Sequence, residues 1–421
     1  MKIAILGNGG REHALASQIS KSPKIEKIYC IPGNAGTSIV AENVKIEIDD
    51  FNKIYNFVKI NQLDLVIVGP EKPLVDGIVD FLEKKKVKVF GPSQKASQLE
   101  GSKIFTKQIC QKFNIPTAKF GIFNNGQEAL EYLKNTKFPI VIKADCIAAG
   151  KGVYICETIR NGEQAIKEIF NGKFGKADEL LIEEFLKGEE MSFFVISDGI
   201  NIKNFGTAQD HKRVGEGDVG LNTGGMGAYS PSRLENDELN KKILDKIIKP
   251  TLKALEDLDT SFRGFLYAGL MIKDKEPYLI EYNVRMGDPE CQTILPRLKT
   301  NFFEIVEATI NQKLNQIDVV WSDAKTLSIV QCSKGYPETY ENNLEIKNLD
   351  QIILTENEFI FHAGTKISNS KIVSNGGRVL NFVAKSKSFK NSREIVVDLI
   401  NKINWKNGFY RKDIGYKVID E

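Results

Sequence analysis

The chain has 421 residues, of which 42% are apolar and 27% charged, and its formal net charge is only +3. This composition is ordinary for a folded globular protein, and the length allows two to four domains. The positive charge is spread along the chain, which argues against a nucleic-acid-binding arm or a basic membrane helix. No apolar run approaches the roughly 20 residues that a membrane span needs, and a strand predicted directly after Met1 leaves no room for a signal peptide. We therefore expect a cytoplasmic protein that binds neither nucleic acid nor membrane.

The cysteines and histidines exclude some metal sites. No two of the six cysteines have C-x-x-C spacing, so the sequence indicates neither a zinc site nor a redox pair. Scattered cysteines without a framework fit a reducing compartment. With only three histidines, a histidine-rich metal site is also excluded.

The first hundred residues alternate strand-like and helix-like segments, which predicts a parallel sheet with helices on both faces. Ligands of such sheets bind beyond the carboxyl ends of the strands. The predicted strands are at 3–6, 25–31, 65–68 and 87–90, and the predicted helices are at 12–20, 52–60 and 76–85. The loops that follow the strands are at 7–13, 32–37, 69–71 and 91–93.

The first of these loops, G-N-G-G-R-E-H at 7–13, contains part of a dinucleotide-binding fingerprint. However, Glu12 stands where the fingerprint has a third glycine, and no acidic residue ends the second strand to hold a ribose. These departures argue against NAD. What remains is a glycine turn at a helix N-terminus, which can bind an anion, and Arg11 beside it suits a phosphate monoester. A tight structural turn is the alternative interpretation.

A glycine loop with two lysines follows in the middle of the chain. Residues 139–143 predict a buried strand that ends in Lys143, and the small-residue loop 148–153 leads into a strand at 153–156. The P-loop pattern is absent. A glycine loop between two strands can still cover a triphosphate with its N–H groups, while Lys143 and Lys151 neutralise charge. Further strands are expected at 180–186 and from 188 onward, after a helix at 161–170.

A second glycine-rich segment spans residues 206–231. Seven glycines fall between 206 and 227, which is too many for a regular element and indicates a binding loop lined by backbone. A flexible linker is the alternative, but Met226, Tyr229 and the lack of a serine-rich pattern argue against it.

The segment E-Y-N-V-R-M-G-D-P-E at 281–290 follows an apolar run at 264–272 and a polar turn, which together predict a hairpin of two strands. Residues two apart on a strand point to the same face. Glu281 and Asn283 therefore present a carboxylate and an amide oxygen side by side, both suited to Mg²⁺. Arg285 is next in this alternation if the strand continues, where it could reach a phosphate or carboxylate. A surface strand ending in a charged turn is the alternative.

The last hundred residues shift in composition and predict a small mixed domain. Strand-like runs lie at 326–331, 352–354 and 379–383, separated by turns, and a helix is expected at 392–403.

Taken in order, these segments resemble the phosphoribosylamine–glycine ligase family, which are ATP-grasp enzymes of purine biosynthesis. The resemblance covers essentially the whole chain, and its middle segments are highly specific. The family usually has glycine and leucine at the positions of Cys146 and Ile147, and leucine or phenylalanine at Met286. The motifs are G-N-G-G-R-E-H-A-L at 7–15, P-G-N-A-G-T at 32–37, G-P-E at 69–71, G-S-K at 101–103, K-A-D at 143–145, A-A-G-K-G-V at 148–153, E-E-F-L-K-G-E-E at 183–190, Q-D-H-K-R-V-G at 209–215, N-T-G-G-M-G-A-Y-S-P at 222–231, G-F-L-Y-A-G-L-M at 264–271, R-M-G-D-P-E at 285–290, F-H-A-G-T at 361–365 and N-G-G-R-V-L at 375–380.

The resemblance implies an α/β and α+β multidomain fold. It consists of a Rossmann-like parallel sheet over 1–102 that binds phosphoribosylamine, an ATP-grasp domain over 103–320 with a lid subdomain at about 118–190, and a small mixed α/β domain over 321–421. The implied reaction joins glycine to 5-phosphoribosylamine with ATP and Mg²⁺ or Mn²⁺, through a glycyl phosphate. A monomer is expected. The alternatives are another ATP-grasp carboxylate–amine ligase or a non-catalytic ATP-binding module.

The resemblance also implies roles for individual residues. Metal ligation rests on Glu281 and Asn283, because the preceding strand at 264–272 lacks the carboxylate that many ATP-grasp enzymes carry there. The implied catalytic residues are Arg285, Lys151 and Asp210. The implied ATP-binding residues are Lys103, Lys143, Gly150, Gly152, Glu183, Glu184, Phe185, Leu186 and Glu190. The implied substrate-binding residues are Gly9, Gly10, Arg11, Glu71, Lys212, Asn222, Thr223, Gly224, Gly225, Met226, Gly227, Asp288 and Pro289.

Overall fold

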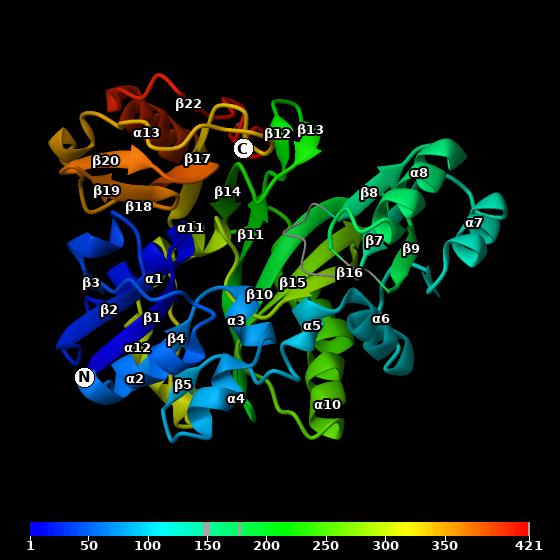
Figure 1. Ribbon diagram of the computed structural model, residues 1–421, viewed down its shortest axis with the longest axis horizontal. Coiled ribbons are helices and arrows are strands. Elements are labelled where there is room, and N and C mark those ends of the chain that lie inside the picture. The colour runs from blue at the N-terminus through cyan, green and yellow to red at the C-terminus, as the bar shows by residue number, and fades with distance from the viewer. Residues whose placement is uncertain (146–151, 176–177, 420–421) are drawn as a thin grey trace.

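The computed structural model describes residues 1–145, 152–175 and 178–419. Figure 1 shows the N-terminal sheet in blue and the C-terminal elements in orange and red on one side of a central green sheet, with a smaller sheet carrying two helices on the other side. No helix within these described ranges has the length and apolarity to cross a membrane.

The N-terminal sheet is parallel throughout, as predicted, and has the strand order β3-β2-β1-β4-β5. The helix predicted at 76–85 is present as the shorter helix 78–83, which begins after Gly77, whose φ is +91°. A separate short helix precedes it at 71–75. The strands are β1 (Lys2–Gly7), β2 (Lys27–Pro32), β3 (Glu42–Asn43), β4 (Leu65–Val68) and β5 (Val89–Phe90). The helices are α1 (Gly10–Ile19), α2 (Phe51–Asn61), α3 (Glu71–Val75) and α4 (Ile78–Glu83).

The central sheet runs in the order β16-β15-β10-β11-β14-β17-β21-β18 and continues without interruption into the C-terminal part of the chain. The predicted hairpin is confirmed as β15 and β16, which pair antiparallel. The strands are β10 (Glu189–Asp198), β11 (Ile202–Asp210), β14 (Gly227–Ser230), β15 (Arg263–Lys273), β16 (Glu276–Asn283), β17 (Lys325–Ser333), β18 (Glu358–His362) and β21 (Arg378–Ser386), with β22 (Gly408–Phe409) beside β17. The hairpin β12 (Arg213–Gly215) and β13 (Val219–Asn222) lies within the glycine-rich segment.

A smaller antiparallel sheet, here called the distal sheet, has the order β6-β9-β7-β8 and its own hydrophobic cluster. The amphipathic helices α7 and α8 supply Leu133 and Ile166 to that cluster, which explains why they cover this sheet. Its elements are β6 (Phe120–Phe123), α7 (Gly126–Lys134), β7 (Ile140–Ala144), β8 (Val153–Cys156), α8 (Ile159–Phe170) and β9 (Leu180–Glu184).

The remaining helices join or cover these sheets. They are α5 (Gln98–Gly101), α6 (Lys103–Lys112), α9 (Asp237–Ile243), α10 (Lys249–Asp257), α11 (Glu290–Ile294), α12 (Phe302–Ile310) and α13 (Phe389–Lys402). Short 3₁₀ turns lie at Thr37–Ile39, Leu295–Arg297, Leu314–Gln316 and Leu349–Gln351, and a π-helical turn at Leu244–Ile248 joins α9 to α10.

The C-terminal part is mixed α/β, as expected, with α13 packed on β17 and β21 and a separate hairpin of β19 (Thr365–Ser368) and β20 (Lys371–Ser374). The strand predicted at 352–354 is wrong. Those residues have no strand conformation, and Ile353 is 90% exposed. An apolar β-branched run favours a strand only where a neighbouring strand and a buried face are available to it.

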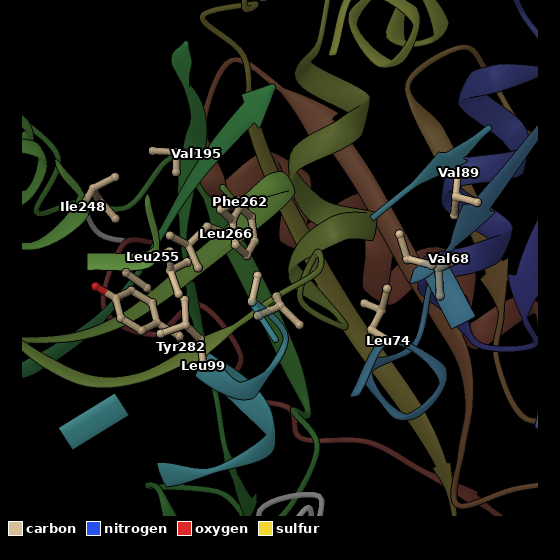
Figure 2. Close-up of a cluster of buried hydrophobic side chains, with 14 of the residues drawn as sticks. Val68, Leu74, Val89, Leu99, Val195, Ile248, Leu255, Phe262, Leu266 and Tyr282 are labelled. Carbon is tan, nitrogen blue, oxygen red and sulfur yellow. The ribbon is translucent and has the colours of Figure 1, made fainter. Parts of the chain in front are cut away.

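One hydrophobic cluster joins the N-terminal sheet to the central sheet. Val68 and Leu74 come from the N-terminal side, Leu266 and Tyr282 come from the central hairpin, and Leu99 lies in the same cluster. Figure 2 shows these side chains together. Burial of this shared apolar surface fixes the carboxyl ends of the N-terminal strands beside the end of β16.

The C-terminal part also contacts the first glycine loop directly. The backbone N–H of His362 donates to Nδ1 of His13 over 2.9 Å, and the Asn34 amide nitrogen donates to the carbonyls of Asn8 and His362, each over 2.8 Å. Burial, with a smaller effect of His362, lowers the pKa of His13 to about 3, and burial lowers the pKa of His362 to about 4. Both imidazoles are therefore neutral at physiological pH.

This contact predicts a specific pH dependence of stability. The ordinary pKa of histidine is 6.5. As the pH falls below this value, the two histidines bind protons in the unfolded chain, but in the folded chain they stay neutral down to about pH 4. The contribution of the two neutral histidines to the free energy of unfolding is complete above pH 6.5. It is lost on acidification, by up to about 1.4 kcal/mol per pH unit for each histidine. We expect His13→Gln, whose side-chain oxygen can still accept the His362 N–H, to lose stability less steeply between about pH 6.5 and 4.5. Urea unfolding of both proteins at several pH values measures this, and identical slopes would contradict it.

Candidate active site

A cleft of about 890 Å³ opens where the N-terminal, central and distal sheets meet, and Arg378 and Lys417 of the C-terminal part also line it. Most of the residues predicted from the sequence line this one cleft. They are Gly9, Arg11, Glu71, Lys103, Lys143, Gly152, Glu183, Glu184, Phe185, Leu186, Glu190, Asp210, Lys212, Asn222, Thr223, Gly224, Glu281, Asn283, Arg285 and Asp288.

The other predicted residues lie behind the cleft wall or outside the described ranges. Gly10 faces Gln292 and Asn381 so closely that a Cβ there would lie 2.5 Å from each amide nitrogen. A Cβ on Gly225 would likewise lie 2.5 Å from Cδ of Pro289. Met226 is fully buried, and Gly227 begins the buried strand β14. Gly150 and Lys151 fall outside the described residues.

The predicted metal pair stands at the end of β16. Gly269 pairs with Glu281 but Leu270 pairs with Leu279, so Ile280 is an extra residue in a β-bulge. After the bulge, Tyr282 is buried in the core, while Glu281 and Asn283 are half-buried and line the cleft. The bulge thus turns both oxygen-bearing side chains toward the cleft.

The chemistry of this pair fits Mg²⁺. One carboxylate and one amide are the small set of protein oxygens that Mg²⁺ accepts while it keeps waters and substrate phosphates. The residue opposite Glu281 is Gly269, which adds no carboxylate. Over the ranges described, no group of three or more His, Cys, Asp or Glu side chains could hold a metal ion by itself.

Arg285 lies beyond the end of β16 at Asn283, so the strand does not continue far enough for Arg285 to share its alternation. It reaches the cleft from the following turn instead. Its Nη2 donates to Glu100 Oε1 over 2.6 Å, and its Nε donates to Glu71 Oε2 over 3.2 Å. Burial opposes the charge of Arg285, but Glu100 and Glu71 raise its pKa overall. Glu100 was not found from the sequence.

Lys143 shares the carboxylate of Glu183 with Lys107. Each lysine nitrogen lies 2.7 Å from a Glu183 oxygen, and all three side chains are buried. Burial opposes ionisation of Glu183, but Lys143 and Lys107 together lower its pKa. The group is a buried ion triad on the wall formed by the distal sheet and α6, and Lys107 had no motif to indicate it.

Asp210 lies at the end of β11 beside Lys212, whose Nζ is 2.8 Å from Glu190 Oε2. Burial, with Glu290 and Glu190 adding to it, raises the pKa of Asp210 to about 7 against the opposing effect of Lys212. A carboxylate with a pKa near neutrality is suited to accept a proton during a reaction.

The predicted anion site at the start of α1 is partly filled by the protein's own carboxylates. Glu12 Oε2 accepts from the backbone of Gly9 over 2.7 Å, and Asp288 Oδ2 accepts from the backbone of Arg11 over 3.2 Å. The Arg11 guanidinium donates to Glu12 Oε1 and to the Met286 carbonyl. Glu12 therefore has a structural reason to replace the third glycine.

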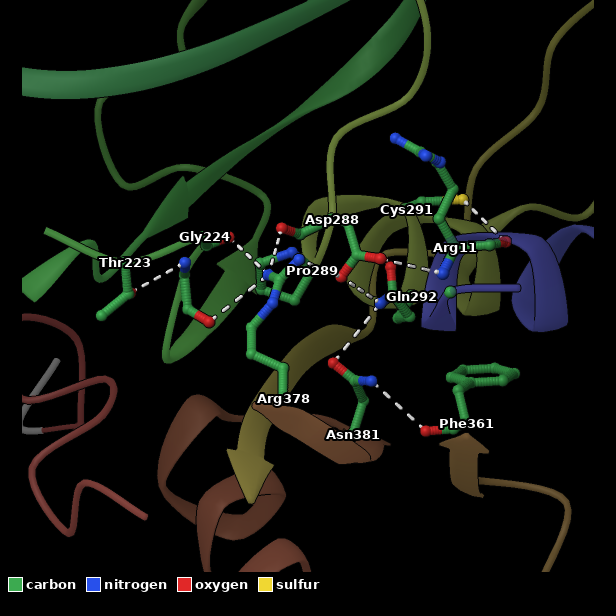
Figure 3. Close-up of polar contacts among 12 residues, drawn as sticks. Arg11, Thr223, Gly224, Asp288, Pro289, Cys291, Gln292, Phe361, Arg378 and Asn381 are labelled. Atoms are coloured by element: carbon green, nitrogen blue, oxygen red, sulfur yellow. Dashed lines mark hydrogen bonds and ion pairs between the residues drawn. The ribbon is translucent and has the colours of Figure 1, made fainter. Parts of the chain in front are cut away.

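Arg378 of β21 joins the second glycine-rich segment to Asp288 (Figure 3). Its Nη1 donates to the carbonyls of Asp288, over 2.6 Å, and Gly224, and its Nη2 lies 3.3 Å from Asp288 Oδ1. Burial opposes ionisation of Asp288, but Arg378 and Arg11 lower its pKa. The N-G-G-R turn at 375–378 was a motif of the resemblance, but the role of its arginine was missed.

Comparison with known proteins accounts for most of the chain. Family models of phosphoribosylglycinamide synthetase match the chain as an N domain over residues 1–100, an ATP-grasp (A) domain over 101–291 and a C domain over 326–417. The chain belongs to the phosphoribosylglycinamide synthetase family. The family and fold class predicted from the motifs are confirmed, and so is the enzyme class, an ATP-grasp ligase.

Similar proteins match over nearly their full length. The phosphoribosylamine–glycine ligases of Brucella melitensis and Caldanaerobacter subterraneus are 44% and 45% identical, covering 100% and 99% of this chain and 99% of each relative. The crystal structure of phosphoribosylamine–glycine ligase from Thermotoga maritima has a TM-score of 0.86 and 32% identity, covering 99% of this chain and 100% of that one. A biotin carboxylase from Campylobacter jejuni shares the fold, with a TM-score of 0.73 at 15% identity, covering 96% of this chain and 91% of that chain.

Proposed function

We propose that this chain ligates glycine to 5-phosphoribosylamine at the expense of ATP, giving glycinamide ribonucleotide, ADP and phosphate in purine biosynthesis. The observation that carries the proposal is the single cleft that brings together Glu281, Asn283, Arg285 and Asp210 beside the first glycine loop. The phosphoribosylamine–glycine ligases described above, which are 44–45% identical to the chain, support the same reaction.

ATP is assigned to the side of the cleft formed by the distal and central sheets. The backbone of Glu184, Phe185 and Leu186 takes the adenine, and Glu190 takes the ribose. Lys103, Lys143, Gly150, Lys151 and Gly152 take the phosphates, with Glu183 holding Lys143 in place. Glu281 and Asn283 hold Mg²⁺ or Mn²⁺, which supplies positive charge against the phosphates.

The acceptor substrates are assigned to the N-terminal side. Gly9, Gly10 and Arg11 take the 5′-phosphate of phosphoribosylamine. This requires Glu12 to give up its hydrogen bond with the Gly9 N–H and Asp288 to give up its bond with the Arg11 N–H. Further residues shape the pocket for the ribose and glycine. They are Glu71, Lys212, Asn222, Thr223, Gly224, Gly225, Met226, Gly227, Asp288 and Pro289.

The reaction then follows in two steps. A glycine carboxylate oxygen attacks the γ-phosphorus and ADP leaves, while Arg285 stabilises the charge of the transferring group. The amine of phosphoribosylamine attacks the carbonyl carbon of glycyl phosphate, phosphate leaves, and Asp210 accepts a proton from the amine. Exclusion of water matters, because both glycyl phosphate and phosphoribosylamine hydrolyse.

We also propose that the enzyme is a cytoplasmic monomer with domains at 1–102, 103–320 and 321–421. The boundary at residue 320 divides the central sheet between two domains, since β14 before it pairs with β17 after it.

Isotope transfer tests the proposed intermediate. Glycine labelled with ¹⁸O in both carboxylate oxygens is expected to transfer one label to inorganic phosphate per turnover, because the attacking oxygen leaves with the phosphate. Release of ADP is expected to need both glycine and phosphoribosylamine. Unlabelled phosphate would contradict the acyl phosphate, a different acceptor requirement would indicate another ATP-grasp ligase, and ATP binding without turnover would indicate a non-catalytic module.

A further inference from the structure

Glu100 contacts successive residues of the E-Y-N-V-R segment through one carboxylate. Its Oε2 accepts from the backbone N–H of Val284 over 2.8 Å, and its Oε1 accepts from Arg285 Nη2 over 2.6 Å. The same Oε1 lies 3.0 Å from the amide nitrogen of Asn283, in the orientation that lets this nitrogen donate. The Glu100 side chain is only 9% exposed.

The fold holds Glu100 firmly in this position. It belongs to α5, which packs against β16. The preceding residue, Leu99, is buried in the cluster that joins the N-terminal and central sheets. Two and three residues after Glu100, Ser102 Oγ and the backbone N–H of Lys103 donate to Asp145, which directly follows β7 of the distal sheet. Glu100 is therefore anchored on both sides, where the three sheets meet.

The contact with Asn283 decides which end of that amide faces the cleft. The two ends have nearly the same shape, but only the oxygen can ligate a cation. Both Glu100 oxygens already accept, from Val284 and Arg285, and the neighbouring carbonyl of Tyr282 can only accept. The end of the Asn283 amide that faces these oxygens must therefore be its nitrogen. The Asn283 oxygen then turns away from Glu100, and Tyr282 O reinforces this orientation by accepting from the same nitrogen over 3.2 Å.

We propose that Glu100 is the positioning residue of the metal site, which orients the oxygen of Asn283 toward the cation and holds Arg285 beside it. This inference rests on the metal ligands assigned under the proposed function. Partners of this kind around a metal site commonly change metal affinity by about 10- to 100-fold when they are removed. Glu71 provides the matched comparison, because it contacts Arg285 by a hydrogen bond but has no such bond to Asn283.

The test measures Mn²⁺ binding to the full chain with ADP, by electron paramagnetic resonance, and does not depend on turnover. In Glu100→Gln, the backbone N–H of Val284 is expected to keep the remaining oxygen, which leaves the new amide nitrogen facing Asn283. We expect this to reverse the Asn283 amide and turn its nitrogen toward the cleft. The dissociation constant for Mn²⁺ should rise about 10- to 100-fold. Glu71→Gln should change it less than about twofold. Equal effects of the two variants, or no effect of Glu100→Gln, would overturn the proposal.

A second pair of variants keeps the proposal testable if Glu100→Gln alone folds poorly. Asn283→Asp places two carboxylates about 3 Å apart, so it should weaken Mn²⁺ binding. The double variant E100Q/N283D should bind Mn²⁺ more tightly than N283D, because the glutamine introduced by E100Q can donate to the new carboxylate. An additive loss would overturn the proposal. If Glu281→Gln left Mn²⁺ binding unchanged, the metal site itself would be wrong, which is a separate result.

Discussion

Replacing Glu281 with glutamine is expected to reduce ATP turnover by roughly 10³-fold or more, since loss of a metal ligand removes several kcal/mol of charge stabilisation. Glutamine keeps the shape of the side chain, and Glu281 is half-buried at the cleft, so the fold should remain intact. Coupled ADP release at limiting Mg²⁺ measures the turnover, and thermal unfolding checks the fold.

Glu276→Gln is the matched control for this variant. Glu276 lies at the other end of the same strand and pairs with Lys242 and Lys246 on the surface. Surface substitutions of this kind usually change stability by less than about 0.5 kcal/mol. We expect the control to retain its turnover. Near-normal turnover of Glu281→Gln at limiting Mg²⁺ would contradict the metal assignment.

Replacing Glu183 with glutamine is expected to destabilise the distal sheet by about 3–5 kcal/mol, because it leaves the buried Lys107 and Lys143 without a counter-charge. Because the pKa of Glu183 is lowered, the contribution of its carboxylate to stability is complete at neutral pH. This contribution is lost as the pH falls through the lowered pKa. Hydrogen exchange of the amides of β7 and β9 measures the local stability.

The neighbouring residue offers a control for this second variant. Glu184 is exposed and accepts one hydrogen bond, from the backbone of Lys119 over 2.9 Å. Glu184→Gln is expected to cost no more than about 1 kcal/mol. If both variants exchanged at the same rate, the triad would not be an important source of stability.

Much of the fold could be predicted, because it depends on local pattern. The βα alternation of the first hundred residues gave the parallel sheet, and an apolar run with a polar turn gave the β15–β16 hairpin. Local pattern failed at 352–354, where the apolar run has no strand beside it. It also could not show the bulge at Ile280, which depends on how β16 pairs with β15.

The polar network of the site was less predictable, because its partners are distant in sequence. Glu100 meets Val284 across 184 positions, and Arg378 meets Asp288 across 90. A glutamate in a short helix or an arginine after a glycine turn has no local feature that reveals such a partner. Lys143 was identified from its place at the end of a strand, but its pairing with Glu183 depends on the register of β7 and β9.

The pairing of β14 with β17 has a consequence for attempts to shorten the chain. A protein ending near residue 320 would lose β17 and present the open hydrogen-bonding edge of β14 to solvent. Open edges of this kind recruit strands from other molecules. Such a truncated protein should aggregate or pair with itself. We therefore do not expect the first 320 residues to form a monomer when the chain is cut at the boundary suggested by composition.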